Sequence, residues 1–502
     1  MALALAACLC LGSGFALVSL GWPRRAALAT DLLLRTSLSI GFGLGIFSVI
    51  FYLSLVLQVS CSTNLLLVDG IVFAALAAAR ALQLRLVPIE PQVAWQGNNE
   101  GLPVWLRRSL TPTFVVVLLI AIYAEVTRVR AFPHGDGWDA FTIWNLHARF
   151  LFLGVAHWRD GFTALVGGSH PDYPLLLPAS VAHFWTFLGH DDARVPAVIG
   201  MVFTFATAGV LFAALAVVRG RVPAMMAAIA LLSTPFFIEQ GADQYADIPL
   251  SFFFLATVVL LCFFDGHSGA GYSGDDQSRD DHVTKFVPSY SPGLLVLAGF
   301  AAGFAAWTKN EGILFLFAIA LSRVVIFVLR RRREHRRDGS RLNQLNDSLS
   351  QPGFWKSTVP LFLALLPGLL VVVYYKHSIG VRGDLFSDPA NAVSKLADPA
   401  RYWTIFAGYV KGFFRFGHWL WIPGTLVLAA LGILLGRDRR QTRQPGFSTS
   451  VLALSLTFIG YFCVFLITPY DIHWHLRFSL VRLFLQLWPS TLFLFFLALR
   501  NL

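Results

Sequence analysis

Repeated long apolar runs restrict the possible folds of this chain more than any other feature of its sequence. Many runs contain about 17–22 residues, the length that an α-helix needs to cross roughly 30 Å of hydrocarbon. Hydrophobic residues make up 56% of the 502 residues, whereas charged residues make up only 13%. Only helices and closed barrels satisfy their backbone groups in lipid, and the runs lack the alternating polarity of barrel strands. The sequence therefore predicts an all-α, polytopic transmembrane bundle.

The densest basic cluster, residues 330–337, sets the expected orientation, because Lys and Arg concentrate in cytoplasmic loops. Counting outwards from this cluster predicts about 13 membrane-spanning helices. The spans are expected near residues 2–20, 36–58, 65–82, 113–127, 195–217, 222–238, 248–264, 293–308, 312–329, 358–375, 418–436, 449–468 and 484–499. The net charge of +11 then falls largely in short inner loops, so we attribute it to membrane topology and expect no nucleic-acid partner.

Two further apolar segments are expected at the outer membrane surface. Residues 140–155 predict an interfacial helix with aromatic anchors. Residues 174–190 would move the later arginines to the outside if they crossed the membrane. They therefore predict a juxtamembrane helix that lies in or dips into the outer leaflet.

The expected organisation has four parts and no soluble domain. These are N-terminal membrane helices at 1–112, a module at 113–330 whose first outer loop is 128–194, a basic cytoplasmic loop at 331–357, and C-terminal membrane helices at 358–502. The low-complexity segments 265–292 and 330–357 are assigned no chemistry. The apolar N-terminus has no positively charged start and is expected to be retained as a span. Five cysteines without metal-ligand spacing predict no disulfide framework.

The first outer loop holds the main candidate residues, because charges at the rim of an apolar bundle usually face a cavity, a substrate or an ion. Asp136 and Asp139 lie among glycines and aromatic residues there. Asp139 starts the predicted helix 140–155, where it either caps the helix or acts as a general base. Near the end of the loop stand His170, Asp172 and Tyr173, and Asp172 either makes an ordinary turn or contacts a substrate.

Asp243 and Asp247 form a second outer group. Asp247, followed by Pro249, is in part a conventional helix start. If the segment is helical, the two acids are four residues apart and point the same way, so their repulsion calls for a cation between them.

Cations occur in two later outer turns. Lys309 and Glu311 lie in a very tight turn between two spans, which predicts either a simple ion pair or a phosphate contact by Lys309. The last outer loop leads through His475 to Arg477 and Arg482. These arginines either pair with phosphate oxygens or reach towards lipid headgroups.

This combination of outer carboxylates and cations resembles the GT-C class of membrane glycosyltransferases, in particular its protein-O-mannosyltransferase and aminoarabinose-transferase-like branch. Similar motifs are Asp139 with Trp144, Asp172-Tyr173-Pro174-Leu175, Asp247-Ile248-Pro249-Leu250 and Thr308-Lys309-Asn310-Glu311-Gly312. The resemblance covers roughly residues 113–330. An Asp-Ala pair replaces the usual Asp-Glu at 139–140, which leaves open whether Asp136 or Asp139 is the base, and no large outer C-terminal domain is present.

The resemblance implies a GT-C-like fold and an inverting transfer of a sugar from a polyprenyl-phosphate donor to an acceptor hydroxyl. The site would lie on the extracytoplasmic side of a bacterial inner membrane. Asp139 would take the hydroxyl proton, and Lys309, Arg477 and Arg482 would hold the phosphate. Asp247 would orient these groups, directly or through a divalent metal ion, and no other cofactor is expected. Expected partners are membrane lipid and a glycan, lipid or protein acceptor. The further substrate-binding residues would be His170, Asp172, Tyr173, Asp243, Glu311 and His475.

A transporter or flippase of a lipid-linked envelope precursor is the alternative interpretation, and a non-catalytic scaffold is a third. Charges buried midway along the helices and two related halves would indicate a transporter. The sequence shows few such charges and gathers its polar residues on one face, which favours an enzyme.

Overall fold

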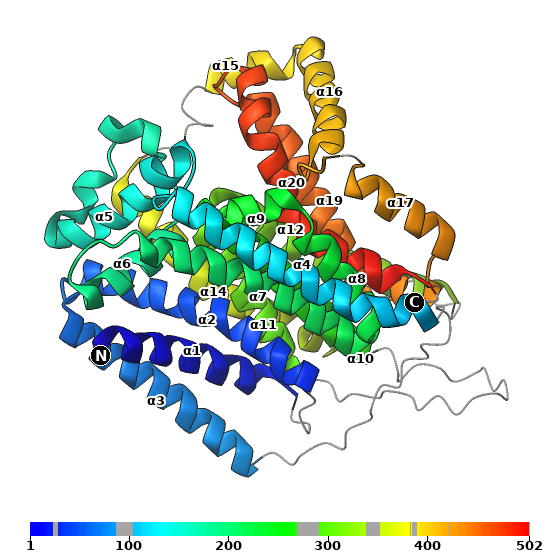
Figure 1. Cartoon of the computed structure of the whole chain (residues 1–502), viewed down its shortest axis with the longest axis horizontal. Helices are drawn as coiled ribbons and strands as arrows, with labels where there is room; N and C mark the ends of the chain where they lie inside the picture. The colour runs from blue at the N-terminus through cyan, green and yellow to red at the C-terminus, as the bar shows by residue number, and fades with distance from the viewer. Residues whose placement is uncertain are drawn as a thin grey trace.

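The computed structural model describes residues 1–23, 29–86, 104–268, 291–337, 352–381, 383, 389–420 and 422–500, and within these residues the protein is helical (Figure 1). The α-helices are α1 (Ala2–Gly21), α2 (Ala29–Val56), α3 (Ser62–Leu86), α4 (Val104–Ala131), α5 (Asn145–Gly154), α6 (Leu176–Leu188), α7 (Arg194–Val218), α8 (Arg221–Leu232), α9 (Pro235–Ala242), α10 (Asp247–Ser268), α11 (Pro292–Thr308), α12 (Asn310–Arg337), α14 (Pro352–Ile379), α15 (Pro389–Leu396), α16 (Pro399–Arg415), α17 (Gly424–Leu435), α18 (Arg439–Thr442), α19 (Pro445–Ile467) and α20 (Ile472–Ala498). Three short non-α helices, Ala140–Trp144, Val155–Gly161 and Ala164–Ser169, lie around α5. The predicted all-α class is confirmed.

Ten of these helices are long and apolar enough to cross a membrane, judged by length and composition within the described residues. They are α1, α2, α3, α4, α7, α10, α12, α14, α19 and α20. The pair α8 and α9, bent by 64°, could form an eleventh span. The spans predicted at 293–308 and 418–436 correspond to α11 and α17, which have only 17 and 12 residues. The chain is thus a multi-pass membrane protein, and the predicted count of about 13 spans is not confirmed within the described residues.

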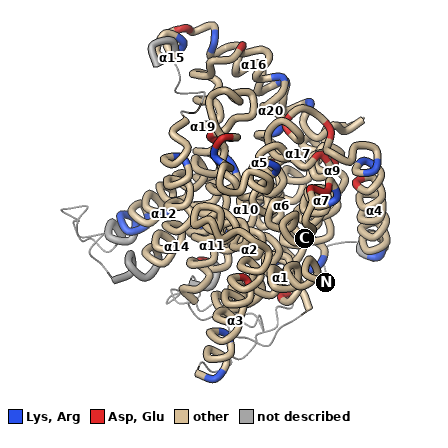
Figure 2. The backbone as a smooth tube through the Cα atoms, turned by 90° about the vertical axis from the view of Figure 1, so that its left-hand side faces the viewer, with Lys and Arg blue, Asp and Glu red and all other residues tan. Residues whose placement is uncertain are grey.

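Helix α10 lies at the centre of the bundle, and an 18-residue stretch of it is wholly buried in the protein. Helices α7, α11, α19 and α20 pack around it, whereas α3 and α4 lie at the periphery, as the two views together show (Figure 1 and Figure 2). Small residues allow the closest contacts between neighbours. A methyl group at Gly368 of α14 would come within 2.6 Å of the Cα atom of Gly303 in α11. Such close approach of backbones is a common way of packing helices in lipid.

The two predicted outer helices are present, but the second is not at the surface. The predicted helix 140–155 begins as a π-helical turn, Ala140–Trp144, and continues as α5. The segment predicted to lie in the outer leaflet forms α6, which packs against α2 and α5 and is buried along most of its length. Its apolar side chains are therefore covered by protein, because α5 and its flanking turns lie over it. Helices α15 and α16 follow α14 in the C-terminal part of the chain.

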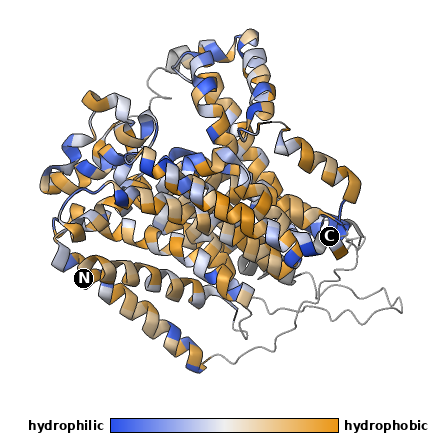
Figure 3. Cartoon of the chain, in the orientation of Figure 1, coloured by the Kyte–Doolittle hydropathy of each residue, from blue (hydrophilic) through white to orange (hydrophobic). Residues whose placement is uncertain are grey.

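Helix α12 separates the turn at Lys309 from the basic cluster at residues 330–337. It begins at Asn310, and Arg330 lies 20 residues later, about 30 Å along the helix axis. Hydrophilic positions gather near α5, α15 and α16, while α1, α2 and α7 are mostly apolar (Figure 3). Of the two low-complexity segments, residues 269–290 and 338–351 lie outside the described residues, whereas α10 and α12 extend to Ser268 and Arg337.

Candidate functional site

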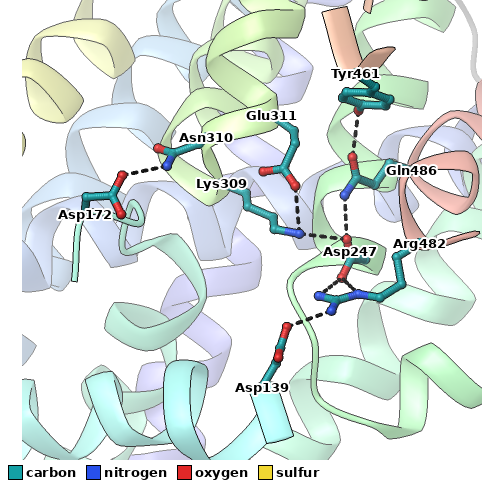
Figure 4. A network of polar contacts seen from close by, with 9 residues as sticks. All are labelled: Asp139, Asp172, Asp247, Lys309, Asn310, Glu311, Tyr461, Arg482 and Gln486. Carbon is teal, nitrogen blue, oxygen red and sulfur yellow. Dashed lines mark hydrogen bonds and ion pairs between the residues drawn. The ribbon is translucent and has the colours of Figure 1, made fainter. Parts of the chain in front are cut away.

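Acidic and basic side chains from four separate segments form one connected network (Figure 4). Its ionic members come from the loop between α4 and α5, the start of α10, the junction of α11 and α12, and α20, and they are Asp139, Asp247, Lys309, Glu311 and Arg482. Adjoining blue and red positions near α5 and α20 show the same gathering of charge on the backbone (Figure 2). Residues separated by up to 343 positions in the sequence thus meet in one place.

Asp247 is the centre of this network. Its side chain is fully buried, and both carboxylate oxygens accept hydrogen bonds from other side chains. Oδ1 accepts from Lys309 Nζ at 3.1 Å and from Gln486 Nε2 at 2.5 Å. Oδ2 accepts from Arg482 Nε at 3.0 Å and Nη2 at 2.8 Å. With no exposed surface and no free oxygen, Asp247 positions the two cations instead of meeting a substrate.

Arg482 joins Asp247 to Asp139. Its Nη1 donates to Asp139 Oδ2 at 2.7 Å, while its other nitrogens face Asp247. The guanidinium also lies over the ring of Tyr245, 4.6 Å from the centroid. A buried guanidinium held on three sides is not reaching for lipid headgroups, so the interpretation of Arg482 as a headgroup contact does not apply.

The turn between α11 and α12 places Lys309. The lysine has an extended backbone that ends α11, and Asn310 starts α12 immediately afterwards. The turn is so tight that a methyl group at Gly312 would lie 1.8 Å from the carbonyl oxygen of Ala305, so only glycine fits. Lys309 donates to Glu311 at 2.9 Å as well as to Asp247. Although burial alone lowers the pKa of Lys309, Asp247 and Glu311 raise it above its ordinary value, and the amine is charged.

Asp172 belongs to an adjacent polar group (Figure 4). Its Oδ2 accepts from Asn310 Nδ2 at 2.8 Å. Lys376, at the end of α14, donates to the Asp172 backbone oxygen at 2.9 Å and to Asn310 Oδ1 at 2.8 Å, and its Nζ lies 3.4 Å from Asp172 Oδ2. Consecutive residues 309 and 310 therefore serve two different aspartates, which the turn brings close together.

The loop that carries Asp139 is shaped by two glycines. Gly135 and Gly137 have φ angles of +81° and +87°, which side chains other than glycine rarely adopt. A methyl group at Gly137 would lie 2.6 Å from the Tyr245 hydroxyl, so the loop is pressed against the α9–α10 turn. Asp139 precedes the π-helical turn without capping it through its side chain. Its carboxylate is therefore available to Arg482, and the cap interpretation is not supported.

Asp136 and Asp243 belong to a separate ion cluster. Arg128 of α4 donates to Asp243 Oδ1 and to Asp136 Oδ2, each at 2.7 Å. Burial raises the pKa of Asp243 to about 6, although Arg128 opposes the shift. Asp243 and Asp247 do not share a helix face, because α9 ends at Ala242, α10 begins at Asp247, and Gln244 between them has a φ of +62°. Each aspartate has its own cation, so the expected repulsion across a shared face does not arise.

Tyr173 and His170 lie beside the network, with their rings stacked at 5.0 Å. Tyr173 also stacks on Trp144 at 5.7 Å, and Lys309 Nζ lies 6.0 Å from the tyrosine ring centroid. Burial and the neighbouring carboxylates of Glu311 and Asp172 raise the pKa of Tyr173 well above its ordinary value, so its hydroxyl is neutral. These aromatic faces line the side of the network nearest the first outer loop.

His475 and Arg477 lie in the first turns of α20, before Arg482. His475 forms a 2.8 Å hydrogen bond with Thr468. The Arg477 side chain is exposed, with its guanidinium 5.6 Å from the ring centroid of Phe478. The structure therefore brings Arg482 to the carboxylates but leaves Arg477 facing outwards, which fits the interpretation of Arg477 as a headgroup contact.

Five residues that hydrogen-bond to the network or to the two neighbouring polar clusters were not predicted from the sequence: Arg128, Asn310, Lys376, Tyr461 and Gln486. Gln486 follows Arg482 by four residues, so both lie on one face of α20, a spacing that could have identified it. Asn310 lies inside the tight turn that the sequence had already indicated. Tyr461 donates to Gln486 Oε1 at 2.7 Å from the middle of α19, and no local signal distinguishes it from other aromatic residues of the spans.

The charge balance limits what this site can bind. Three carboxylates face two cations, and Oε2 of Glu311 is buried without a hydrogen-bond partner among the described residues. An incoming anion therefore competes with the protein's own carboxylates. No group of three or more His, Cys, Asp or Glu side chains suited to a metal ion occurs in the described part of the chain. The carboxylates of Asp139, Asp247 and Glu311 each face a cationic side chain.

Comparison of this chain with protein-family models, with curated proteins and with solved structures found no match.

Proposed function

We propose that this protein is an inverting membrane glycosyltransferase of the GT-C type that moves a sugar from a polyprenyl-phosphate donor to an acceptor hydroxyl. The observation that carries the proposal is the shared contact of Asp139 and Asp247 with Arg482, next to Lys309. One partly exposed carboxylate beside two fixed cations provides a base and an anion site within one network. Sugar transfer from a lipid phosphate needs both.

In the proposed reaction, Asp139 accepts the proton of the acceptor hydroxyl, and the oxygen attacks the anomeric carbon of the sugar. The bond from that carbon to the phosphate oxygen breaks, and the electron pair leaves with the phosphate. Arg482 and Lys309 stabilise the charge that develops there, because donors fixed in advance cost no reorganisation during the reaction. Asp247 and Gln486 act as positioning residues, since they hold the cations and do not face the substrate.

The location of the network supports an extracytoplasmic site. The network lies at the first turn of α12, and the arginines 330–333 lie near the other end of the same helix. Lys and Arg clusters mark the cytoplasmic side. A lipid-linked donor fits the opposite side of the membrane.

The test is a transfer assay with the purified protein, a panel of radiolabelled polyprenyl-phosphate sugars and envelope extract as acceptor. Asp139→Asn is expected to lower transfer by at least about 100-fold, the usual contribution of a general base. Asp191→Asn is the matched control, because Asp191 is an exposed acid of the same outer loop that pairs with Arg149. Near wild-type transfer by Asp139→Asn together with loss in Asp136→Asn would move the base to Asp136.

A transporter or flippase of a lipid-linked precursor is the second candidate, and acids inside the spans favour it. Asp69 of α3 is fully buried and lies 2.9 Å from His183 of α6, and Glu125 of α4 is fully buried. Intramembrane acids often mark transport pathways. Proteoliposomes loaded with a fluorescent lipid-linked sugar distinguish the two functions. Movement of the lipid across the bilayer without any acceptor would support the transporter, and transfer without such movement would support the enzyme.

A further inference from the structure

The two carboxylates that contact the Arg482 guanidinium differ in burial and in their number of partners. On one side, Nε and Nη2 face Asp247, whose side chain has no exposed surface. On the other side, Nη1 faces Asp139, whose side chain is 24% exposed. Among the described residues, Arg482 is the only ion-pair partner of Asp139, whereas Asp247 is also held by Lys309 and Gln486.

This difference identifies the carboxylate that can leave. The network already contains one more carboxylate than cations, so a phosphate that simply joined it would add repulsion. Glu311 is held by Lys309 and has one buried oxygen. Asp139 lies at the end of a loop, caps no helix and has solvent beside it. Breaking its contact with Arg482 disturbs the least structure and frees one nitrogen for an anion.

We propose that the anionic phosphate of the donor displaces Asp139 from Nη1 of Arg482, so that donor binding itself releases the carboxylate. This inference rests on the proposed function and deepens it. In the resting structure, Oδ2 of Asp139 is occupied by the arginine. After displacement, that oxygen is free to accept a hydrogen bond from the acceptor hydroxyl, which a general base must reach directly. The order of events follows: the phosphate binds first, and the base becomes available afterwards.

The distinguishing test is a binding measurement that involves no sugar transfer. The full-length protein in nanodiscs is titrated with a short-chain polyprenyl phosphate, and the dissociation constant is measured by calorimetry, with the corresponding polyprenyl alcohol as a control for tail binding. Asp139→Asn removes the competing carboxylate, so it is expected to bind the phosphate about tenfold more tightly, equivalent to about 1.4 kcal/mol. Asp139→Glu keeps a competing carboxylate and is expected to bind like the wild type. Asp191→Asn is expected to leave affinity unchanged.

Unchanged or weaker phosphate binding by Asp139→Asn would overturn the proposal. A double-mutant cycle gives a second measurement: in the Arg482→Lys background, which has no guanidinium fork, Asp139→Asn is expected to gain less than twofold. If Asp139→Asn still tightens phosphate binding tenfold in that background, Asp139 and the phosphate do not compete for the guanidinium of Arg482.

Failure of the inference and failure of the proposed function give different results. If Asp139→Asn abolishes transfer without tightening phosphate binding, the function stands and the displacement is wrong. If Asp139→Asn tightens binding while the wild type transfers no sugar from any donor, the displacement stands and the function is wrong.

Discussion

Replacement of Asp247 by asparagine is the sharpest test of the idea that this residue holds the site together. The change keeps the shape of the side chain but removes a charge that faces Lys309 at 3.1 Å and Arg482 at 2.8 Å. At an effective dielectric constant of about 20, one such contact is worth about 5 kcal/mol before desolvation is subtracted. Breaking a buried ion pair by removing one partner typically costs about 3–5 kcal/mol. We expect Asp247→Asn to lose stability in this range, because the remaining cations repel each other.

The measurement is a reversible SDS titration of the purified protein, read by the reaction of a thiol dye with Cys10 and Cys262, which are buried in the folded structure. The control is again Asp191→Asn, whose ion pair has side chains that are 38% and 40% exposed. An exposed pair contributes about 0–1 kcal/mol. If both variants lose the same free energy of unfolding, Asp247 is not the anchor of the network and the reasoning from its burial is refuted.

Two further predictions concern the neighbouring turns. Because the folded state raises the pKa of Asp243 to about 6 from an ordinary 3.8, the folded protein binds this proton more tightly than the unfolded chain does. As the pH rises from 4 to 6, the contribution of Asp243 to the free energy of unfolding should therefore fall by at most about 3 kcal/mol and then stay constant. SDS titrations of the wild type and of Asp243→Asn across this range measure the effect. If the free energies of unfolding of the two proteins change with pH in the same way, the prediction is wrong. Gly312→Ala should force the turn away from the Ala305 carbonyl and weaken polyprenyl-phosphate binding. The control is Gly70→Ala in α3, where a methyl group meets nothing within 4 Å and binding should not change. Equal binding by the two variants would show that the turn does not position Lys309.

The fold was predictable to the extent that it depends on composition. Apolar runs of spanning length gave the all-helical, multi-pass character, and most predicted spans overlap the observed helices. The count of about 13 is not confirmed, because α11 and α17 have only 17 and 12 residues and apolar composition alone does not reveal where a helix is short. Helix α6 was misplaced for a related reason. A segment that is apolar on all sides can be covered by lipid or by protein, and the sequence does not distinguish the two.

The candidate site was predictable through its charged residues. Asp139, Asp247, Lys309 and Arg482 each stand out in an apolar chain, and the structure brings them together. Uncharged partners such as Tyr461 and Gln486 were missed, because an isolated polar group inside a span gives little local signal. Arg477 was grouped with Arg482 by proximity in sequence, but five residues along an α-helix turn it to a different face.

The adjacency of Lys309 and Asn310 links the surroundings of Asp247 and Asp172. The two side chains contact different aspartates but share one peptide bond in a turn that cannot widen at Gly312. A ligand that pulls Lys309 towards itself must therefore shift Asn310, and with it the hydrogen bond to Asp172. Such coupling is reciprocal: if occupancy near Asp172 changes affinity at Lys309 by some factor, occupancy at Lys309 changes affinity near Asp172 by the same factor. Under the proposed function, a donor bound on one side of this turn would change the affinity for an acceptor bound on the other side, although the two do not touch.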